Sequence, residues 1–392
     1  MNDVPSIFQP LILKFISSTV ASFQQIHLAF ICYSFIIMDS LKDLVLKEFA
    51  RFPAKHISEA SFKKAICILP ICDNKRQKHD TVVQEVIDHV SVAGRMTDEA
   101  VPVALLDPLS TRVSLKNSKI SSAYIIKVVN QCPLMETFIL DGCLQVDDSS
   151  VEYILRNCKY MRCLSLNNCR KVTDLSLGYL REAILKGYKI DTVYIGGDFN
   201  ITLNGLEKFF APDADKILAD LTDINIGGLN VTASVINSIC THCKAIKSLC
   251  VSYASNSVVN ETSLNQIVSQ YAGTLEQLEF AWLGCSSMGV DHATLSITEI
   301  SPDFLILLVH TCPRLSHVDV CGMKCFNIAN VQRMIDTRNA MISENVALFG
   351  TEVDRYFVPL RYINMKFVSN PAGTTSQLDQ MMASNPDIKI VI

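Results

Sequence analysis

Two cysteine pairs of this chain have the spacing of metal ligands. Cys240 and Cys243 are separated by two residues, one of which is His242, and Cys321 and Cys325 are separated by three. Thiolate and imidazole groups at such spacings bind zinc, but a structural zinc site takes four ligands. Neither pair has a second pair nearby in the sequence, so we expect neither a metal ion nor another cofactor.

A thiol and an imidazole also lie on one short stretch, at Cys321 and His317. Cysteine catalysis requires a base within hydrogen-bonding distance of the thiol and a third group that orients the base. Two residues four positions apart on a strand are too distant for that contact. The chain also lacks the phosphate-binding glycine loops and the signatures of zinc proteases and serine hydrolases. We therefore predict that the protein is not an enzyme and has no catalytic residues.

The overall composition excludes some partners and favours a compartment. Of the 392 residues, 49% are hydrophobic and 19% are charged, and the net charge is -4. Nucleic-acid binders usually carry a basic field, so no nucleic acid is expected as a partner. The 15 cysteines are spread among apolar neighbours and are interpreted as buried thiols. Free thiols favour a reducing compartment, which predicts the cytoplasm, with the nucleus as a second location.

The cysteines acquire another meaning when residues 158–174, CKYMRCLSLNNCRKVTD, are compared with their neighbours. After Cys158 come apolar residues at fixed intervals, then Cys169 and the pair Thr173-Asp174. Pairs of apolar residues in the same phase recur along the chain at Val113/Leu115, Phe138/Leu140, Leu164/Leu166, Val193/Ile195, Ile224/Ile226, Leu249/Val251, Leu278/Phe280 and Val318/Val320. A pattern that recurs in this way along the chain is the signature of a solenoid.

The full pattern, C-x2-L-x2-L-x-L-x2-C-x2-[IV]-T-D, resembles the cysteine-containing leucine-rich repeat over residues 107–340. The resemblance implies an α/β leucine-rich-repeat solenoid, a right-handed curved array of parallel strands and helices. The residues agree with it, because Leu164 and Leu166 alternate with polar positions as on a strand. Thr173 or Asp174 can cap the helix that follows. No unit can bury its apolar face alone, so the stacking of units creates the core.

The period is broken at several places towards the C-terminus. Residues 283–302 lengthen the connection between two predicted strands, and an insertion of this kind either makes contacts or is an adapted loop without a role. An irregular stretch is expected over residues 339–357, and Tyr362 is expected to pack over the open end of the stack. A last strand is predicted near residues 388–392.

We divide the chain into three segments. Residues 107–392 are the solenoid with its C-terminal cap, and residues 39–106 are a helical cap or an adaptor-docking segment. Residues 1–38 are an apolar extension whose nature stays open: a membrane anchor, a buried cap, or a dispensable piece before a true start at Met38. Polar residues interrupt the apolar run, so a membrane anchor is the less favoured of the three.

The segment 39–106 contains apolar spacings typical of short amphipathic helices, one of them over residues 81–92. A basic turn is expected before that helix, at residues 74–79. Leu41, Val45 and Phe49 resemble the short box with which substrate receptors dock on elongin-type adaptors. The alternative is that these helices only form the polar-edged cap that a solenoid needs at its open end.

Side chains between and beside the inward-facing residues point to the concave face of the array. The charges on this face change from basic to acidic along the chain, which suits a protein partner of complementary charge. Tyr194, with Trp282 near the adjoining edge, is the predicted aromatic anchor; the alternative is that Trp282 is buried under the insertion. The predicted partner-binding residues are Arg112, Lys116, Asp141, Tyr194, Asp223, Glu279, His317 and Asp319.

The repeat class resembles that of F-box proteins and related receptors. This resemblance implies a non-catalytic scaffold that recognises substrates for a cullin-type ubiquitin ligase. An elongin-type or Skp-type adaptor and a cullin are then partners, and a protein substrate occupies the concave face. The alternative is a leucine-rich-repeat interaction module in signalling or chromatin assembly without a ligase link. A membrane-anchored or secreted receptor ranks third.

Overall fold

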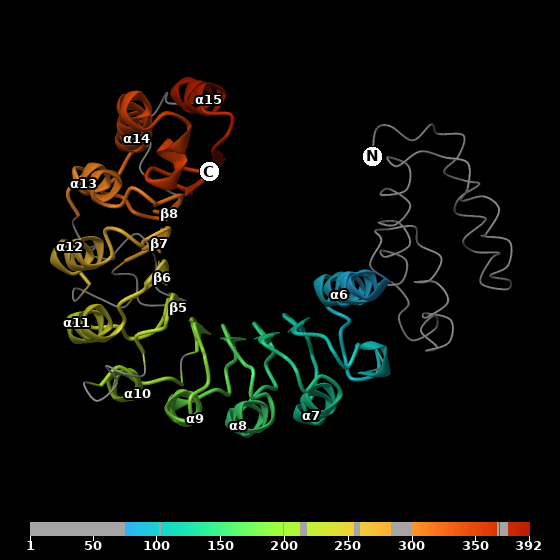
Figure 1. Cartoon of the computed structure of the whole chain (residues 1–392). Coiled ribbons are helices and arrows are strands. Elements are labelled where there is room, and N and C mark those ends of the chain that lie inside the picture. Colours follow the sequence, from blue (N-terminus) through green and yellow to red (C-terminus); the bar gives the residue numbers. More distant parts are fainter. Residues whose placement is uncertain are drawn as a thin grey trace, which may run out of the picture.

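The protein is an open, curved solenoid whose strands line the inner side and whose helices cover the outer side (Figure 1). The computed structural model describes residues 75–101, 103–198, 200–211, 218–254, 259–283, 300–366, 368 and 375–392. Within these residues one sheet of ten parallel strands runs in sequence order, each strand pairing with the next. This is the predicted α/β solenoid of the leucine-rich-repeat type.

Each strand is three residues long, and most connections contain one helix. The strands are β1 Arg112–Ser114, β2 Thr137–Ile139, β3 Cys163–Ser165, β4 Thr192–Tyr194, β5 Asp223–Asn225, β6 Ser248–Cys250, β7 Gln277–Glu279, β8 His317–Asp319, β9 Tyr362–Asn364 and β10 Lys389–Val391. The helices are α6 Lys75–Val92, η1 Val103–Leu105, α7 Ser122–Gln131, α8 Asp148–Asn157, α9 Asp174–Leu185, α10 Leu203–Phe209, α11 Ala233–His242, α12 Glu261–Gln270, α13 Phe304–Thr311, α14 Ile328–Phe349, η3 Gly350–Arg355 and α15 Thr375–Ser384.

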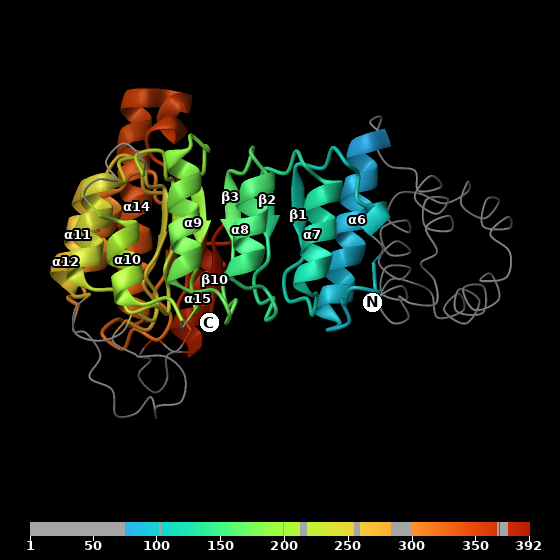
Figure 2. The same cartoon turned by 90° about the horizontal axis from the view of Figure 1, so that it is seen from below.

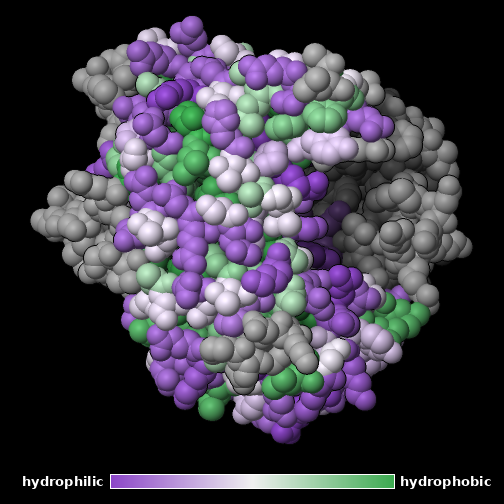
Figure 3. Space-filling view, turned by 60° about the vertical axis from the view of Figure 1, so that its left-hand side comes forward, coloured by the Kyte–Doolittle hydropathy of each residue, from purple (hydrophilic) through white to green (hydrophobic). Residues whose placement is uncertain are grey.

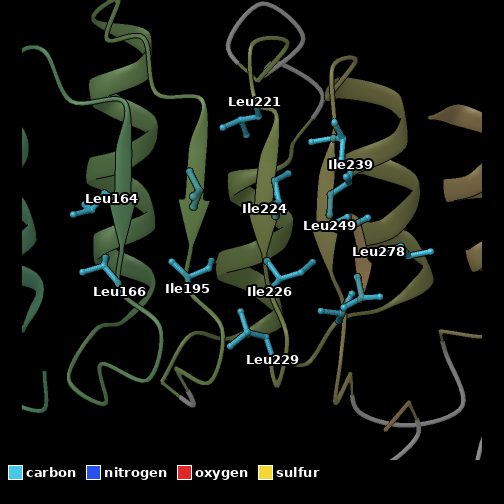
Figure 4. Packing of buried hydrophobic residues seen from close by; sticks show 14 of the residues in the cluster. Leu164, Leu166, Ile195, Leu221, Ile224, Ile226, Leu229, Ile239, Leu249 and Leu278 are labelled. Atoms are coloured by element: carbon cyan, nitrogen blue, oxygen red, sulfur yellow. The ribbon is translucent and has the colours of Figure 1, made fainter. Parts of the chain in front are cut away.

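The core lies between the sheet and the helices. Leu164 is in register with Phe138 on one side and Val193 on the other, and all three side chains are buried. Figure 4 shows the same stacking further along, where Ile224 and Leu249 of neighbouring strands lie in one layer with Ile239 of α11. The inward residues therefore form continuous apolar rows, which is how repeats that cannot fold alone acquire a common core.

The Thr-Asp pair of the repeat joins successive units. Thr173 is the N-cap of α9, and its hydroxyl accepts a hydrogen bond from Leu175 N. Asp174 accepts from Thr202, the N-cap of α10, through both the backbone N (2.7 Å) and the hydroxyl (2.6 Å). Asp148 binds Thr173 in the same way. Each threonine therefore caps its own helix, while the aspartate holds the cap of the next.

The repeat-phased cysteines lie inside the structure, and none of the described cysteines is in a disulfide. Four of them are buried C-cap residues of helices: Cys132, Cys158, Cys243 and Cys312. Two others occupy the turn after a strand, where Cys143 Sγ lies 3.0 Å from Leu115 O and Cys169 Sγ 3.1 Å from Leu140 O. Each of these thiols donates to the carbonyl that directly follows the strand of the preceding repeat.

The helix predicted over residues 81–92 is present as α6, but it is longer than predicted. It begins at Lys75, so the basic stretch 74–79 is not a turn but lies mostly on the first turns of the helix. The helix packs beside the first strand (Figures 1 and 2). Gln84 there replaces a neighbouring strand: its Nε2 donates to Ser114 O (2.8 Å), and Ser114 N donates to its Oε1 (2.9 Å).

Two expectations at the C-terminal end were wrong. The stretch 339–357 is mostly regular, because α14 runs to Phe349 and η3 follows it. Tyr362 does not cover the open end but begins β9, which pairs with β8 and β10. The strand predicted near residues 388–392 is present as β10. No helix in the described part of the chain is long and apolar enough to cross a membrane.

Candidate protein-binding surface

A groove of about 500 Å³ lies on the concave side of the strands β1 to β5. Two arginines, four acidic residues and one tyrosine give it its character. Its lining residues are Arg112, Glu136, Thr137, Ile139, Asp141, Arg162, Cys163, Ser165, Asp191, Thr192, Tyr194 and Asp223.

Four of the predicted partner-binding residues meet in this groove: Arg112, Asp141, Tyr194 and Asp223. Side chains alternate between the two faces of a strand. The leucine positions point towards the helices, so these four side chains point to the concave face. Lys116 is exposed after β1 but does not line the groove. The three remaining concave residues lie on later strands, and the predicted adaptor-docking residues Leu41, Val45 and Phe49 lie outside the described residues.

Three charged lining residues were not predicted: Glu136, Arg162 and Asp191. Each directly precedes a strand and occupies the first of the two spacer positions between the first and second apolar residues of L-x2-L-x-L. The pattern contains the signal, because both residues of its x2 spacer lie outside the core. Arg162 Nη2 forms an ion pair of 2.5 Å with Asp191 Oδ2, and Nε donates to the same oxygen at 3.0 Å. This contact raises the pKa of Arg162.

The ring of Tyr194 is half-buried among acidic groups. Burial raises the pKa of its hydroxyl, and the nearby Asp223 raises it further. Burial likewise raises the pKa of Asp223. Asp141 is fixed differently, because its Oδ1 accepts hydrogen bonds from Ser165 Oγ and from Asn167 N (2.9 Å). The groove therefore presents a neutral phenol beside carboxylates and arginines, which is a surface for polar recognition.

The other predicted residues, Glu279, His317 and Asp319, form a second cluster on β7 and β8. Glu279 is the register partner of Asp319. Burial raises the pKa of both carboxyls, and Asp319 raises that of Glu279 further. Asp319 accepts hydrogen bonds from Asn364 Nδ2 and Cys321 N, both at 2.9 Å.

His317 and Cys321 have different neighbours. The imidazole Nδ1 lies 2.7 Å from Ser316 Oγ, and the ring stacks on Tyr362 with centroids 5.8 Å apart. Burial lowers the pKa of His317, and Arg361 lowers it further. The Cys321 thiol faces Trp282 instead. Within the described residues, no group of three His, Cys, Asp or Glu side chains is placed to hold a metal ion.

Tyr194 and Trp282 do not form one aromatic site. Tyr194 ends β4, whereas Trp282 follows β7, three strands further along the sheet. Trp282 is partly exposed and stacks on Tyr253 with ring centroids 6.4 Å apart.

The comparisons with known proteins add little to this geometry. No protein-family model matches the chain, and a search of curated proteins found no match. Among solved structures, the chain is similar to one described as the Rad7 and Elc1 complex in yeast, with 13% identity and a TM-score of 0.45. The similarity covers 99% of this chain and 98% of that one. At this level it identifies neither a family nor a partner.

Proposed function

We propose that this protein is a non-catalytic scaffold that binds a segment of another protein on its concave face. The observation that carries the proposal is the groove, where the half-buried ring of Tyr194 lies among charges of both signs. Binding energy at protein interfaces concentrates in a few residues, and tyrosine and arginine are enriched among them. Mixed charges match a protein segment better than a uniform polyanion. The part of the convex side that Figure 3 turns forward, in contrast, mixes hydrophilic residues with scattered hydrophobic ones.

The groove is tested by capture of partners on the tagged full-length chain. Replacing Tyr194 with Ala is expected to weaken binding of the captured protein about tenfold, because the ring is the central aromatic of the groove. Tyr160→Ala is the matched control, since this tyrosine is 61% exposed and does not line the groove. Equal binding by the two variants, with both folded by circular dichroism, would remove the groove from the proposal.

Within this function, we propose a role as substrate-recognition subunit of a cullin-type ubiquitin ligase. Residues 39–106 then dock an elongin-type or Skp-type adaptor, and residues 107–392 hold the substrate. The support is the resemblance of Leu41, Val45 and Phe49 to an adaptor box. The cytoplasm, with the nucleus as a second location, is the proposed compartment.

An interaction module without a ligase link is the second candidate, and one observation favours it. Helix α6 already has a structural task, because Gln84 bonds to both backbone groups of Ser114 at the first strand. A helical segment that caps the sheet needs no adaptor to explain it.

Mass spectrometry of the captured proteins separates the two candidates. The ligase role predicts an adaptor and a cullin among them, and predicts their loss when Leu41, Val45 and Phe49 are all replaced by Ala. The groove-bound protein should stay on that variant. Capture of a groove-dependent protein without any adaptor or cullin would leave only the interaction module.

A further inference from the structure

The turn after each of the strands β1 to β8 contains a residue in the left-handed backbone region. Glycine or asparagine, which tolerate this conformation, fills most of these positions: Asn117, Gly142, Asn168, Gly197, Gly228 and Gly322. Two successive turns have instead Tyr253, with φ of 57°, and Trp282, with φ of 51°. A bulky side chain in this region costs about 1–2 kcal/mol. Strain of this kind, at two adjacent turns, points to a function for the side chains.

The two rings form an ordered surface at the ends of β6 and β7. They are nearly parallel, with an interplanar angle of 16°. The backbone holds them in place, since Tyr253 N donates to Ala281 O (2.8 Å) and Trp282 N donates to Cys321 O (2.9 Å). The Trp282 ring lies against Gly322, where any Cβ would collide with it. Tyr253 is 44% exposed and is the accessible end of the stack.

The sheet beside this stack carries negative charge. Eight side chains of β5 to β8 flank the inward residues, and they include three carboxylates but no lysine or arginine: Asp223, Asn225, Ser248, Cys250, Gln277, Glu279, His317 and Asp319. Within the described residues, none of the three carboxylates has an ion-pair partner. Of the basic residues nearby, Lys247 and Arg361 precede their strands and lie at the opposite rim from the stack, whereas Lys366 follows β9, and Gly322 N donates to its backbone oxygen at 2.7 Å.

We propose that the concave face of β5 to β8, with the Tyr253–Trp282 stack, binds an extended protein segment that carries arginine. One guanidinium pairs with Glu279 and Asp319, and a second lies over the exposed Tyr253 ring. Arginine suits both places, because its planar group binds carboxylates through two hydrogen bonds and also stacks on aromatic faces.

This inference rests on the proposed scaffold function and adds the chemistry of the partner. The two carboxylates oppose each other in register, an arrangement that costs folding energy while no cation is bound. A guanidinium between them removes that repulsion. An acidic segment would instead meet three carboxylates that have no ion-pair partner among the described residues.

The chain has a built-in reporter for this test, because Trp282 is its only tryptophan. The full-length chain is titrated with a synthetic peptide of alternating Arg and Gly while the tryptophan emission is followed. A saturable change is expected with this peptide, a weaker one with Lys in place of Arg, and none with Glu in place of Arg. Equal responses to the Arg and Glu peptides, or a response to spermine equal to that to the Arg peptide, would overturn the proposal.

Two variants separate binding from folding. The double variant Glu279→Gln/Asp319→Asn should bind the Arg peptide about tenfold more weakly, while circular dichroism should show that it is folded. Tyr253→Asn should lose about threefold in affinity and gain stability, because Asn fits the left-handed turn. A merely structural role for Tyr253 would leave the affinity unchanged. The control Glu207→Gln/Glu344→Gln removes two exposed carboxylates on the helices α10 and α14 and should bind as the natural chain does.

The result also distinguishes this inference from the function on which it rests. If the double variant still captures the natural partner while Tyr194→Ala loses it, the scaffold function stands and the arginine-bearing segment is refuted. If neither variant affects capture and no peptide binds, both proposals fail.

Discussion

The two halves of the solenoid differ at the buried position of the turn after each strand. In the first half this position is polar: Ser118, Cys143, Cys169 and Asp198 follow β1 to β4. In the second half it is apolar: Leu229, Ala254, Leu283 and Met323 follow β5 to β8. Three residues of the first set, Ser118, Cys143 and Cys169, donate to backbone carbonyls, whereas the second set fills space with apolar atoms.

The same repeat is therefore used differently in the two halves of the molecule. Two thiols of the first half, Cys143 and Cys169, bond to the preceding repeat, and this half carries the groove. Where packing alone fills the turn, the sequence has more freedom. The second half accordingly contains the strained aromatic pair Tyr253 and Trp282 and the long connection that includes α14. Breaking one anchor in each half tests the contrast.

The largest effect is expected at Arg338, which fastens α14 to the second half. Its guanidinium is fully buried, and it donates to Pro313 O (2.8 Å) and Cys312 O (2.6 Å) at the end of α13. Burial lowers its pKa to about 10. Arg338→Ala leaves a cavity and two unbonded carbonyls, so we expect a loss of about 4 kcal/mol in the free energy of unfolding by urea.

Arg333→Ala is the control on the same helix. Its side chain is 63% exposed and pairs with Asp303, so removal should cost about 0.5 kcal/mol at most. Similar losses for the two arginines would show that the contacts of Arg338 do not hold the second half.

The next effect concerns the aromatic stack. Gly322 and Gly94 have nearly the same φ, 70° and 68°, but a Cβ would meet the Trp282 ring at Gly322 and nothing within 4 Å at Gly94. Gly94→Ala should therefore cost only the backbone strain, about 1 kcal/mol, whereas Gly322→Ala should cost about 3 kcal/mol. Thermal unfolding measures both, and only Gly322→Ala should shift the tryptophan emission. Equal costs would mean that the ring moves aside freely.

In the first half, Asp198 differs from the other polar residues at this position of the turn. Its side chain is fully buried, neither carboxyl oxygen has a hydrogen-bond partner, and burial raises its pKa to about 9. The folded state therefore keeps a proton that the unfolded chain releases near pH 3.8. Stability from this group is complete below that pH and is lost as the pH rises towards about 9.

Asp198→Asn should remove this loss. We expect the variant to be more stable by about 2 kcal/mol at pH 8 and equal to the natural chain near pH 4, as measured by urea unfolding. Asp198→Cys, which restores the thiol of the two preceding repeats, should behave alike. If the natural chain and both variants have the same free energy of unfolding at both pH values, ionisation of Asp198 does not destabilise the folded state.

Much of the fold was predictable, because it repeats. The apolar pairs set the phase of eight strands, and the outward residues followed from alternation, so that Arg112, Asp141, Tyr194 and Asp223 could be assigned to the concave face. Strand β9 was missed although Leu360, Ile363 and Met365 carry the spacing of the repeat, because the long connection before it hid the period.

The site was less predictable than the fold. The ion pair of Arg162 with Asp191 depends on which residues become neighbours across strands, and the number of residues between repeats is not constant. The stack of Tyr253 and Trp282 depends on a backbone conformation that these residue types rarely adopt. Periodicity gives the position of a side chain on a face, but it does not give the partner.

The smallest effect compares two thiols of one repeat. Cys169 is buried and donates to Leu140 O at 3.1 Å, whereas Cys163 is partly exposed in the groove. Cys169→Ala should cost about 1 kcal/mol, since it leaves a carbonyl of the first half without its donor, and Cys163→Ala should cost almost nothing. Cys169→Ser keeps a donor and should recover part of the loss, an outcome that a purely apolar role of the thiol does not allow. Ala and Ser variants of equal stability at position 169 would therefore show that the first half, like the second, is held by packing alone.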